Sequence, residues 1–174
     1  MLQNNEHSTQ YLCRLLADLF IKNDLKFVTA ESCTGGMISA TCTDLAGSSN
    51  WFERGFVTYS NAAKTEMLGV DAALIEAHGA VSEAVARAMA FGAIRHSAAQ
   101  VSIAVTGVAG PSGGSAAKPV GTVWFGFSIQ GSLHSETMRF DGDRAAVREQ
   151  TVMHALARVI SLLSDESELG SLSN

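Results

Sequence analysis

Three short apolar segments, separated from one another by helical stretches, restrict the folds open to this chain. Residues 25–30 and 52–60 each have the pattern of a strand, and residues 101–106 form an apolar run typical of a strand buried on both faces. Because strands separated by helices imply a sheet covered on both sides, the pattern predicts an α/β fold, a three-layer α/β/α sandwich.

The remaining segments complete this prediction. Helices are expected after caps at Ser8 or Thr9, at Asn61 and at Ser82, and over residues 36–46, 71–78 and 143–163. Residues 79–83 are interpreted only as the start of a helix. Residues 120–129 and 133–140 form a late β-hairpin that turns at Gln130-Gly131, so the sheet is mixed and mainly parallel. Residues 1–174 are expected to form a single domain, with its core in residues 8–163 and a polar, frayed tail at 164–174.

The composition excludes some classes of protein. Apolar residues make up 47% and charged residues 17% of the 174 positions, which is typical of a folded domain. The formal net charge of -5 disfavours a non-specific nucleic-acid binder, because such proteins need a basic surface to replace phosphate counterions. No nucleic-acid partner is expected, whereas a small phosphorylated ligand needs only a few local donors.

The termini, cysteines and histidines indicate the compartment. The N-terminal segment lacks the pattern of a signal peptide, and no apolar run is long enough to cross a bilayer, so no membrane partner is expected. Cys13, Cys33 and Cys42 form no CxxC pair, which favours a reduced, cytoplasmic setting. The histidines are scattered without metal-ligand spacing, so neither a metal nor a cofactor is predicted.

The turn after the first predicted strand is the strongest candidate for a reactive site. Its sequence is Glu31-Ser32-Cys33-Thr34-Gly35-Gly36, and a helix is expected directly after it. The glycines let the backbone approach a ligand closely, and free N–H groups at a helix N-terminus favour a phosphate or a developing oxyanion. Ser32 would sit beside these donors, where an acyl-transfer nucleophile is useful. The alternative is that Ser32 and Thr34 only cap the helix.

A serine nucleophile needs a base, and the candidate is a lysine. No histidine follows the pattern of a Ser-His-Asp triad, and no Gly-x-Ser-x-Gly elbow is present. Lys64 follows the second predicted strand, and a buried lysine can lose its proton near neutral pH. Tyr59 can orient the lysine or relay a proton. The alternatives are a solvated helix lysine and a core tyrosine with a satisfied hydroxyl.

Cys33 is a rival nucleophile, because thiols are intrinsically more reactive and a helix N-terminus lowers their pKa. Together with Glu31 and Lys64 it would form a plausible amidase set. The alternative is a small buried side chain. Since Ser32 and Cys33 are adjacent, their side chains are expected to diverge, so that only one of them faces the site.

Two further segments offer ligand contacts. Residues 106–115 are the most glycine-rich stretch and follow a buried strand, so they should emerge where α/β proteins bind ligands. They match neither a P-loop nor a Rossmann fingerprint, but their amides can form an anion nest. Arg144 and Arg148 lie one helical turn apart and can clamp a phosphate. The alternatives are a flexible loop and a solvated helix face whose arginines pair with Asp141 or Glu149.

Six motifs in one order carry a resemblance to a known family. They are residues 30–36, Tyr59-Ser60-Asn61 with Lys64, and residues 79–83, 106–111, 118–122 and 142–144. The series closely resembles the nicotinamide-nucleotide amidase family, also known as the CinA C-terminal domain, over about residues 8–163. Ser112 is a departure, because a glycine is common there in the family, and it bears only on the shape of the loop.

The resemblance implies an activity and a set of roles. The family hydrolyses the carboxamide of nicotinamide mononucleotide to nicotinate mononucleotide and ammonia, which returns a pyridine nucleotide to NAD synthesis. The resemblance implies that Ser32 is the nucleophile, Lys64 the general base and Tyr59 an assisting hydroxyl, with no metal. The residues expected to contact the substrate are Cys33, Thr34, Gly35, Gly36, Thr106, Gly107, Gly110, Gly113, Arg144 and Arg148.

Two expectations concern assembly and the alternative function. A homodimer is expected, because small α/β enzymes with a high apolar fraction often pair. The alternative to an enzyme is a nucleotide-binding paralogue that has lost catalysis.

Overall fold

The computed structural model describes residues 8–171, and their side chains as far as residue 165. The elements follow the order predicted from the sequence, with a short 3-10 helix, η1, inside a segment expected to be a loop. They are α1 (Thr9–Lys22), β1 (Phe27–Glu31), α2 (Met37–Thr43), η1 (Ser48–Asn50), β2 (Phe52–Val57), α3 (Asn61–Leu68), α4 (Ala72–His78), α5 (Glu83–Arg95), β3 (Val101–Gly107), β4 (Thr122–Ile129), β5 (Ser132–Arg139) and α6 (Arg144–Ser171).

Within residues 8–171, the strands form one mixed sheet in the order β2-β1-β3-β4-β5. β1 pairs in parallel with β2 and β3, while β4 pairs antiparallel with β3 and β5. Of these strands, β4 alone runs against the others, so the sheet is mainly parallel, as predicted. Gln130 and Gly131 join β4 to β5 with φ values of 46° and 100°, the positive angles that a two-residue hairpin turn needs.

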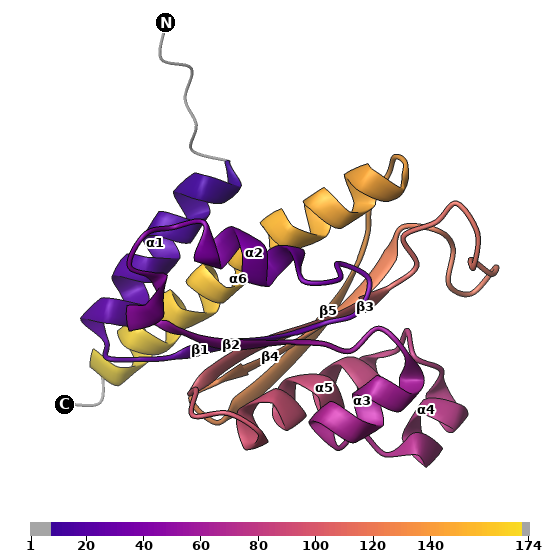
Figure 1. The fold of residues 1–174 in the computed structure, drawn as a ribbon, viewed down its shortest axis with the longest axis horizontal. Coiled ribbons are helices and arrows are strands. Elements are labelled where there is room, and N and C mark those ends of the chain that lie inside the picture. The colour runs from indigo at the N-terminus through magenta and orange to yellow at the C-terminus, as the bar shows by residue number, and fades with distance from the viewer. Residues whose placement is uncertain (1–7, 172–174) are drawn as a thin grey trace, which may run out of the picture.

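Helices cover both faces of the sheet, which confirms the predicted three-layer sandwich (Figure 1). α1, α2 and α6 lie on one face, and α3, α4 and α5 lie on the other. Successive residues of a strand point to opposite faces, so each central strand supplies both layers. In β3, Ile103 belongs to the core under α1 and α6, whereas Ala104 belongs to the core under α5. This explains why residues 101–106 are buried throughout.

Serine side chains start several of the helices. Ser8 Oγ accepts the N–H of Tyr11 at 3.2 Å at the start of α1, as predicted. The predicted cap at Asn61 is wrong, because Ser60 Oγ accepts the N–H of Ala63 at 3.0 Å and Asn61 is already the first residue of α3. The Asn61 amide is therefore free for another role.

The last helix is longer than predicted. α6 runs from Arg144 to Ser171, whereas the sequence pattern suggested an end at residue 163 and a frayed tail over 164–174. The helix is no longer buried where its apolar stripe ends, but it can continue, because each further residue still adds a backbone hydrogen bond. Residues 172–174 lie outside the described part of the chain. No helix within residues 8–171 combines the length and apolarity needed to cross a membrane.

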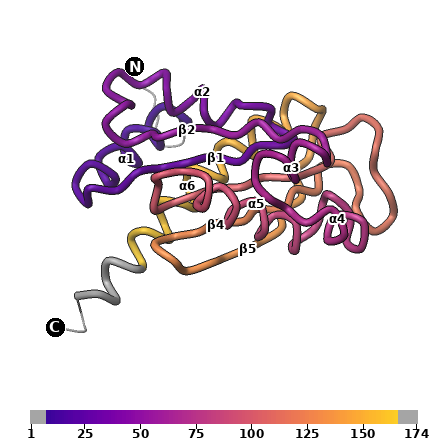
Figure 2. Tube along the Cα trace, turned by 60° about the horizontal axis from the view of Figure 1, so that its bottom comes forward, coloured from indigo at the N-terminus to yellow at the C-terminus, as the bar shows by residue number. Residues whose placement is uncertain are grey.

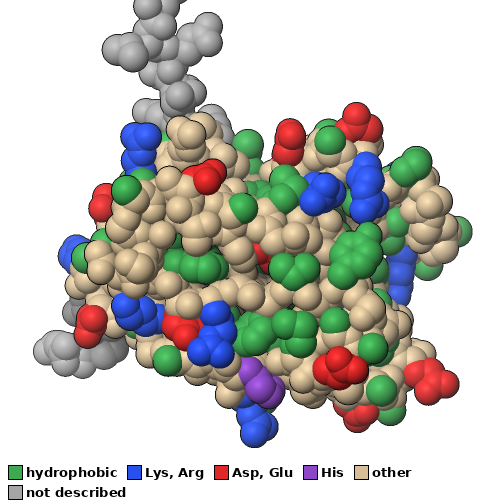
Figure 3. All heavy atoms as spheres, viewed as in Figure 1, with side chains coloured by type: hydrophobic (Ala, Val, Ile, Leu, Met, Phe, Trp, Pro, Cys, Tyr) green, Lys and Arg blue, Asp and Glu red, His purple; other side chains and the backbone are tan. Residues whose placement is uncertain are grey.

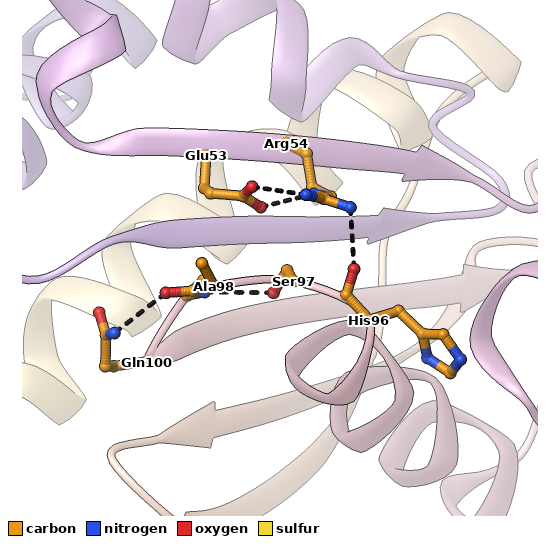
Figure 4. Close-up of polar contacts among 7 residues, drawn as sticks. Glu53, Arg54, His96, Ser97, Ala98 and Gln100 are labelled. Carbon is orange, nitrogen blue, oxygen red and sulfur yellow. Dashed lines mark hydrogen bonds and ion pairs between the residues drawn. The ribbon is translucent and has the colours of Figure 1, made fainter.

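Two tethers join surface segments, one between β2 and the end of α5 and one between the β3–β4 loop and the end of α4. At the edge of the sheet, Arg54 pairs with Glu53 at 2.6 Å and donates to the His96 carbonyl, just after α5, at 2.9 Å (Figure 4). The loop between β3 and β4 lies beside α4 (Figure 2), where Lys118 Nζ donates to the His78 carbonyl at 2.9 Å.

Candidate active site

The carboxyl ends of the three parallel strands meet at one edge of the sheet, and most of the predicted site residues gather there. β1 ends just before Ser32, β2 ends just before Thr58, and β3 ends at Gly107. A cleft of about 200 Å³ lies between these segments. It is lined by Ser32, Cys33, Tyr59, Asn61, Lys64, Ala80, Val81, Thr106, Gly107, Ala109 and Arg144.

Lys64 and Ser32 are in direct contact. Lys64 Nζ lies 3.0 Å from Ser32 Oγ, 2.9 Å from the carbonyl oxygen of Thr58 and 3.4 Å from that of Tyr59. Lys64 is only 1% exposed, and among the described residues no carboxylate forms an ion pair with it. Burial therefore lowers the pKa of Lys64, although the nearby Cys33 thiol opposes this shift. The alternative of a solvated helix lysine is excluded.

The contacts of Lys64 suit a neutral amine. An uncharged –NH2 group has two N–H donors and one lone pair. In the structure Lys64 Nζ donates to Ser32 Oγ and to the carbonyl oxygens of Thr58 and Tyr59. When the amine is neutral, the two carbonyl oxygens can keep the two donors, and the lone pair can accept the proton of the Ser32 hydroxyl. The pair can thus move a proton from serine to lysine, which is the step that makes a serine nucleophilic.

Glu31, the last residue of β1, fixes the turn that carries Ser32. Its carboxylate is fully buried and replaces a capping side chain for α2, because the N-cap residue is a glycine. The donors to this carboxylate are the N–H groups of Gly36, Ile38 and Ser39, at 3.1, 2.9 and 2.8 Å, and the hydroxyls of Thr34 and Ser39, at 2.6 and 2.8 Å. The N-terminus of α2 therefore already holds an anion.

This arrangement corrects the expectation of free N–H donors at Gly35 and Gly36. The N–H of Gly36 donates to Glu31, and the N–H of Gly35 donates to the Ser32 carbonyl at 3.1 Å. Among the described residues of the turn, the N–H groups of Cys33 and Thr34 have no such partner. Two successive N–H groups directly after a nucleophile can hold a developing oxyanion. The turn thus offers donors to an oxyanion, but its helix N-terminus is not available to a phosphate.

Cys33 lines the cleft but is a poor nucleophile. Burial raises the pKa of its thiol to about 12, and the carboxylate of Glu31 adds to this increase. The prediction that the helix N-terminus lowers this pKa is wrong, because Glu31 occupies that position. A protonated thiol is a weak nucleophile at neutral pH. Because Glu31 is bound to α2, it is also not available for a Glu-Lys-Cys set.

The glycine-rich segment divides into two parts. Thr106 and Gly107 end β3 at the cleft, and the Thr106 hydroxyl donates to the Ala80 carbonyl at 2.9 Å. A Cβ at Gly107 would lie 2.7 Å from the Val123 side chain, so only glycine fits against β4. Gly113, by contrast, lies in the exposed stretch 111–117 and is not among the residues that line the cleft.

Arg144 and Arg148 lie one turn apart on α6, and each contacts a segment of the site. Arg144 donates to the Gly110 carbonyl at 3.0 Å and to the Tyr59 hydroxyl at 3.2 Å, and Arg148 donates to the Thr34 carbonyl at 2.9 Å. Figure 3 shows Lys and Arg side chains gathered over the first turns of α6. Both arginines border a second cleft of about 610 Å³, which is lined by Ala109, Pro111, Val120, Gly142, Asp143, Arg144, Ala145 and Arg148.

Tyr59 lies at the rim of the cleft and is 62% exposed, so it is not a core residue. Its backbone carbonyl contacts Lys64, whereas its hydroxyl contacts Arg144. The hydroxyl is thus placed beside a cation at the entrance of the cleft. Within the described residues, no three His, Cys, Asp or Glu side chains gather as a metal site would require.

Comparison with known proteins identifies the family of this chain. The sequence model of the CinA C-terminal domain matches residues 9–163. The chain belongs to the CinA C-terminal domain family. Among its relatives, the nicotinamide-nucleotide amidohydrolase PncC of Enterobacter agglomerans is 56% identical over 128 residues, which cover 73% of this chain and 78% of that protein. PncC of Escherichia coli strain K12 is 54% identical over 129 residues, covering 74% and 78%.

Solved members of the CinA superfamily share the fold. The crystal structure of a CinA superfamily protein from Escherichia coli matches with a TM-score of 0.88 and 38% identity, covering 93% of this chain and 94% of that one. A competence/damage inducible protein from Agrobacterium tumefaciens matches with a TM-score of 0.84 and 45% identity, covering 88% and 94%.

In this CinA-family chain, four residues that line the cleft were not predicted as site residues. They are Asn61, Ala80, Val81 and Ala109. Asn61 was interpreted as a helix cap and residues 79–83 as the start of a helix, since both interpretations account for the local pattern. The segment before α5 reaches the cleft because it folds against the end of β3, where the Ala80 carbonyl accepts from Thr106. The sequence signal that could have identified these residues as site residues was their position within the family motifs.

Proposed function

We propose that this protein deamidates nicotinamide mononucleotide to nicotinate mononucleotide and ammonia, with Ser32 as the nucleophile and Lys64 as the general base. The observation that carries the proposal is the buried contact of 3.0 Å between Lys64 Nζ and Ser32 Oγ beside a cleft. The names of relatives that are 54% and 56% identical supply the substrate.

The reaction runs in two steps. Lys64 takes the proton of Ser32, the Ser32 oxygen forms a bond to the carboxamide carbon, and the C–N bond breaks. Lys64 returns the proton to the leaving nitrogen, so ammonia departs and a nicotinoyl ester remains on Ser32. Water, deprotonated by Lys64, then attacks the ester carbon, and Ser32 recovers its proton as the acid is released.

The N–H groups of Cys33 and Thr34 are the proposed oxyanion donors. They directly follow Ser32, and within the described turn no backbone carbonyl accepts from either of them; the N–H of Cys33 lies beside its own sulfur. Loss of one such donor typically costs on the order of a hundredfold to a thousandfold in turnover. Cys33 itself acts through its backbone, because its raised thiol pKa makes it a poor nucleophile.

The two neighbouring clefts suggest how the nucleotide lies. The smaller cleft, with Ser32, Thr106 and Gly107, is assigned to the nicotinamide ring, whose carboxamide must reach Ser32. Arg144 lines both clefts, so the ribose phosphate is assigned to the larger one, beside Arg144. Gly110 supports Arg144 through its carbonyl, and Gly113 would contact the ligand only if the exposed loop folds inward.

Tyr59 is assigned to this entrance as an assisting hydroxyl, next to Arg144. We further infer that the product returns to NAD synthesis in the cytoplasm and that two copies of the chain pair as a homodimer. Cys13, Cys33 and Cys42 are all free thiols, which agrees with a reduced compartment.

The test is ammonia release from nicotinamide mononucleotide by the purified protein, beside Ser32→Ala and Cys33→Ala. We expect turnover by the wild type, none above background for Ser32→Ala, and a reduction of only a few-fold for Cys33→Ala. An active Ser32→Ala variant together with an inactive Cys33→Ala variant would transfer the nucleophile to the thiol. Thermal stabilisation by the mononucleotide without ammonia release would instead identify a binding protein that has lost catalysis.

A further inference from the structure

The two arginines of α6 have different surroundings, although their spacing is that of a matched pair. Arg144 is exposed and contacts Gly110 and Tyr59, which belong to segments that flank the clefts. Arg148 is partly buried, and the partner of its guanidinium is the Thr34 carbonyl in the nucleophile turn. Its Nε is buried and has no hydrogen-bond partner among the described residues. Arg148 therefore contacts the turn itself.

The peptide unit between Thr34 and Gly35 is held at both ends. Its carbonyl accepts from Arg148 at 2.9 Å and from the N–H of Met37 at 3.3 Å. Its N–H donates to the Ser32 carbonyl at 3.1 Å. Because a peptide unit is planar, holding its two ends sets its orientation. The N–H groups just before this unit, on Cys33 and Thr34, are the free donors beside Ser32.

Gly35 lies next to the guanidinium of Arg148 and has a left-handed backbone conformation that favours glycine, although a Cβ there would make only an ordinary van der Waals contact. This residue has a φ of +60°, and a Cβ built there would lie 3.7 Å from Arg148 Nη2. The charge of Arg148 also reaches the residue after the nucleophile. Burial raises the pKa of Cys33 to about 12, and Arg148 is one of the weaker influences that lower it. A cation at this place favours negative charge on the same side of the turn.

We propose that Arg148 is a positioning residue, which holds the oxyanion donors of Cys33 and Thr34 through the Thr34 carbonyl, while Arg144 is the arginine that meets the substrate. This inference rests on the proposed role of Ser32. It assigns different roles to Arg144 and Arg148, whereas the sequence predicted that both together clamp a phosphate. Misaligned oxyanion donors slow bond formation at Ser32 whatever the ligand, whereas a lost phosphate contact weakens only phosphorylated ligands.

The first experiment measures bond formation at Ser32 with a small alkyl fluorophosphonate, which carries no nucleotide. The Ser32 oxygen bonds to phosphorus, fluoride leaves, the proton passes to Lys64, and the phosphoryl oxygen requires the oxyanion donors. Labelling of Ser32 is followed by mass spectrometry in wild type, Arg148→Met and Arg158→Met. Arg158 is the matched control, because it lies on the same helix and pairs with Glu136 on β5 at 3.0 Å.

We expect Arg148→Met to slow labelling by on the order of thirtyfold to a hundredfold, and Arg158→Met to label at the wild-type rate. Equal rates for Arg148→Met and wild type would overturn the proposal. If Arg148→Met does not fold, Arg148→Lys replaces it, with an expected slowing of about tenfold, because an ammonium keeps the charge but not the planar donor geometry. An Arg148→Lys rate equal to wild type would then overturn the proposal.

The second experiment compares nicotinamide mononucleotide with the riboside that lacks the phosphate. We expect Arg148→Met to lower kcat by the same factor on both substrates and to leave KM within about twofold. A rise in KM confined to the mononucleotide would make Arg148 a phosphate contact and overturn the proposal. Labelling needs no nucleotide, so a wild-type protein that is labelled at Ser32 but releases no ammonia would refute the proposed function alone. A wild-type protein that is not labelled at Ser32 would overturn both.

Discussion

The turn after β1 and the loop after β3 look alike in sequence but differ in structure. Both are rich in glycine, and both follow strands that pair with each other at the centre of the sheet. The side chains of the turn are buried from Glu31 to Thr34, whereas residues 111–117 of the loop are exposed throughout. The two segments therefore meet at one edge of the sheet but are buried to very different degrees.

The difference lies in the number of buried polar partners. The turn is held by the carboxylate of Glu31, by Arg148 of α6 and by the N–H of Ser32, which donates to the Val105 carbonyl at 3.0 Å. The loop is held mainly by contacts at its ends, such as the bond from Lys118 to the His78 carbonyl. Glycine residues indicate where the backbone can turn, but buried polar groups determine which of the two turns has the fixed geometry that catalysis needs. Substitutions that affect the turn should therefore change turnover and stability more than substitutions in the loop.

Replacing Lys64, the lysine of α3 that contacts Ser32 in the turn, should have the largest effect. Lys64→Met keeps the length of a fully buried side chain but removes the group that accepts the Ser32 proton. General base catalysis contributes about a hundredfold to ten-thousandfold, so we expect kcat for ammonia release to fall by on the order of a thousandfold. Thermal unfolding should show no loss of stability, because no buried amine then has to be accommodated. Activity within tenfold of wild type would contradict the assigned base.

The buried carboxylate should decide whether the turn keeps its shape. Glu31→Gln places an amide –NH2 where N–H and hydroxyl donors converge, so at least one of those donors loses its acceptor. We expect the free energy of unfolding to fall by about 2–4 kcal/mol, measured by urea denaturation. Glu53→Gln on the edge strand is the control, because among the described residues Glu53 pairs with the neighbouring Arg54 alone, and its effect should be much smaller. Equal losses for both variants would refute the role of Glu31.

The dependence of activity on pH should report the burial of Lys64. Burial lowers the pKa of Lys64 from 10.5, and only the neutral amine can accept the Ser32 proton. The rate at limiting substrate, kcat/KM, should therefore rise about tenfold per pH unit and reach a plateau below the ordinary lysine pKa. A flat profile, or a midpoint at or above 10.5, would contradict this assignment.

The same groups predict how stability varies with pH. The unfolded chain binds more protons at Lys64 than the folded one between its lowered pKa and 10.5, so stability should rise with pH in that window. Cys33 acts in the opposite direction above about 9, since its pKa is raised to about 12 in the folded protein and the unfolded thiol ionises first. Thermal unfolding of Cys33→Ala across this range should show a steeper rise than the wild type, with the opposing fall from Cys42 still present, because the pKa of Cys42 is raised by its contact with Cys13 and by burial.

Loosening the loop should have the smallest effect. Lys118→Met removes the bond to the His78 carbonyl at the end of α4, which lies near the surface. We expect less than about 1 kcal/mol of lost stability and a change in kcat of no more than about threefold. A larger loss of activity than that of Lys64→Met would reverse the comparison between the two segments.

Much of the fold was predictable from local patterns. The apolar run 101–106, the hairpin turn at Gln130-Gly131 and the cap at Ser8 are each properties of a few neighbouring residues, and the structure agrees with them. The errors arose where two neighbours compete or where a pattern fades. Ser60 and Asn61 are both capable caps, and α6 continues beyond the residues whose apolar spacing marked it.

The site was predictable in part, and mainly through family motifs. Local physics left Ser32 as either a cap or a nucleophile, and the helix dipole suggested free donors and a reactive Cys33. That suggestion failed because the Glu31 side chain folds back onto the start of α2, which neither the helix pattern nor the turn pattern indicates. Asn61 and Val81 were not predicted as site residues, because their positions at the cleft depend on how α3 and α5 pack and not on the local sequence pattern.

The sequence by itself determined the order of the elements, the mixed sheet and the position of the Ser32 turn, because hydrophobic period and turn chemistry are encoded by neighbours in the chain. Only the tertiary structure decided that Lys64 is buried against Ser32, 32 positions earlier, and that Arg148 reaches Thr34 across 114 positions. These contacts depend on the parallel strands ending side by side under packed helices. The same packing excludes water from Lys64, which lowers the pKa of the lysine.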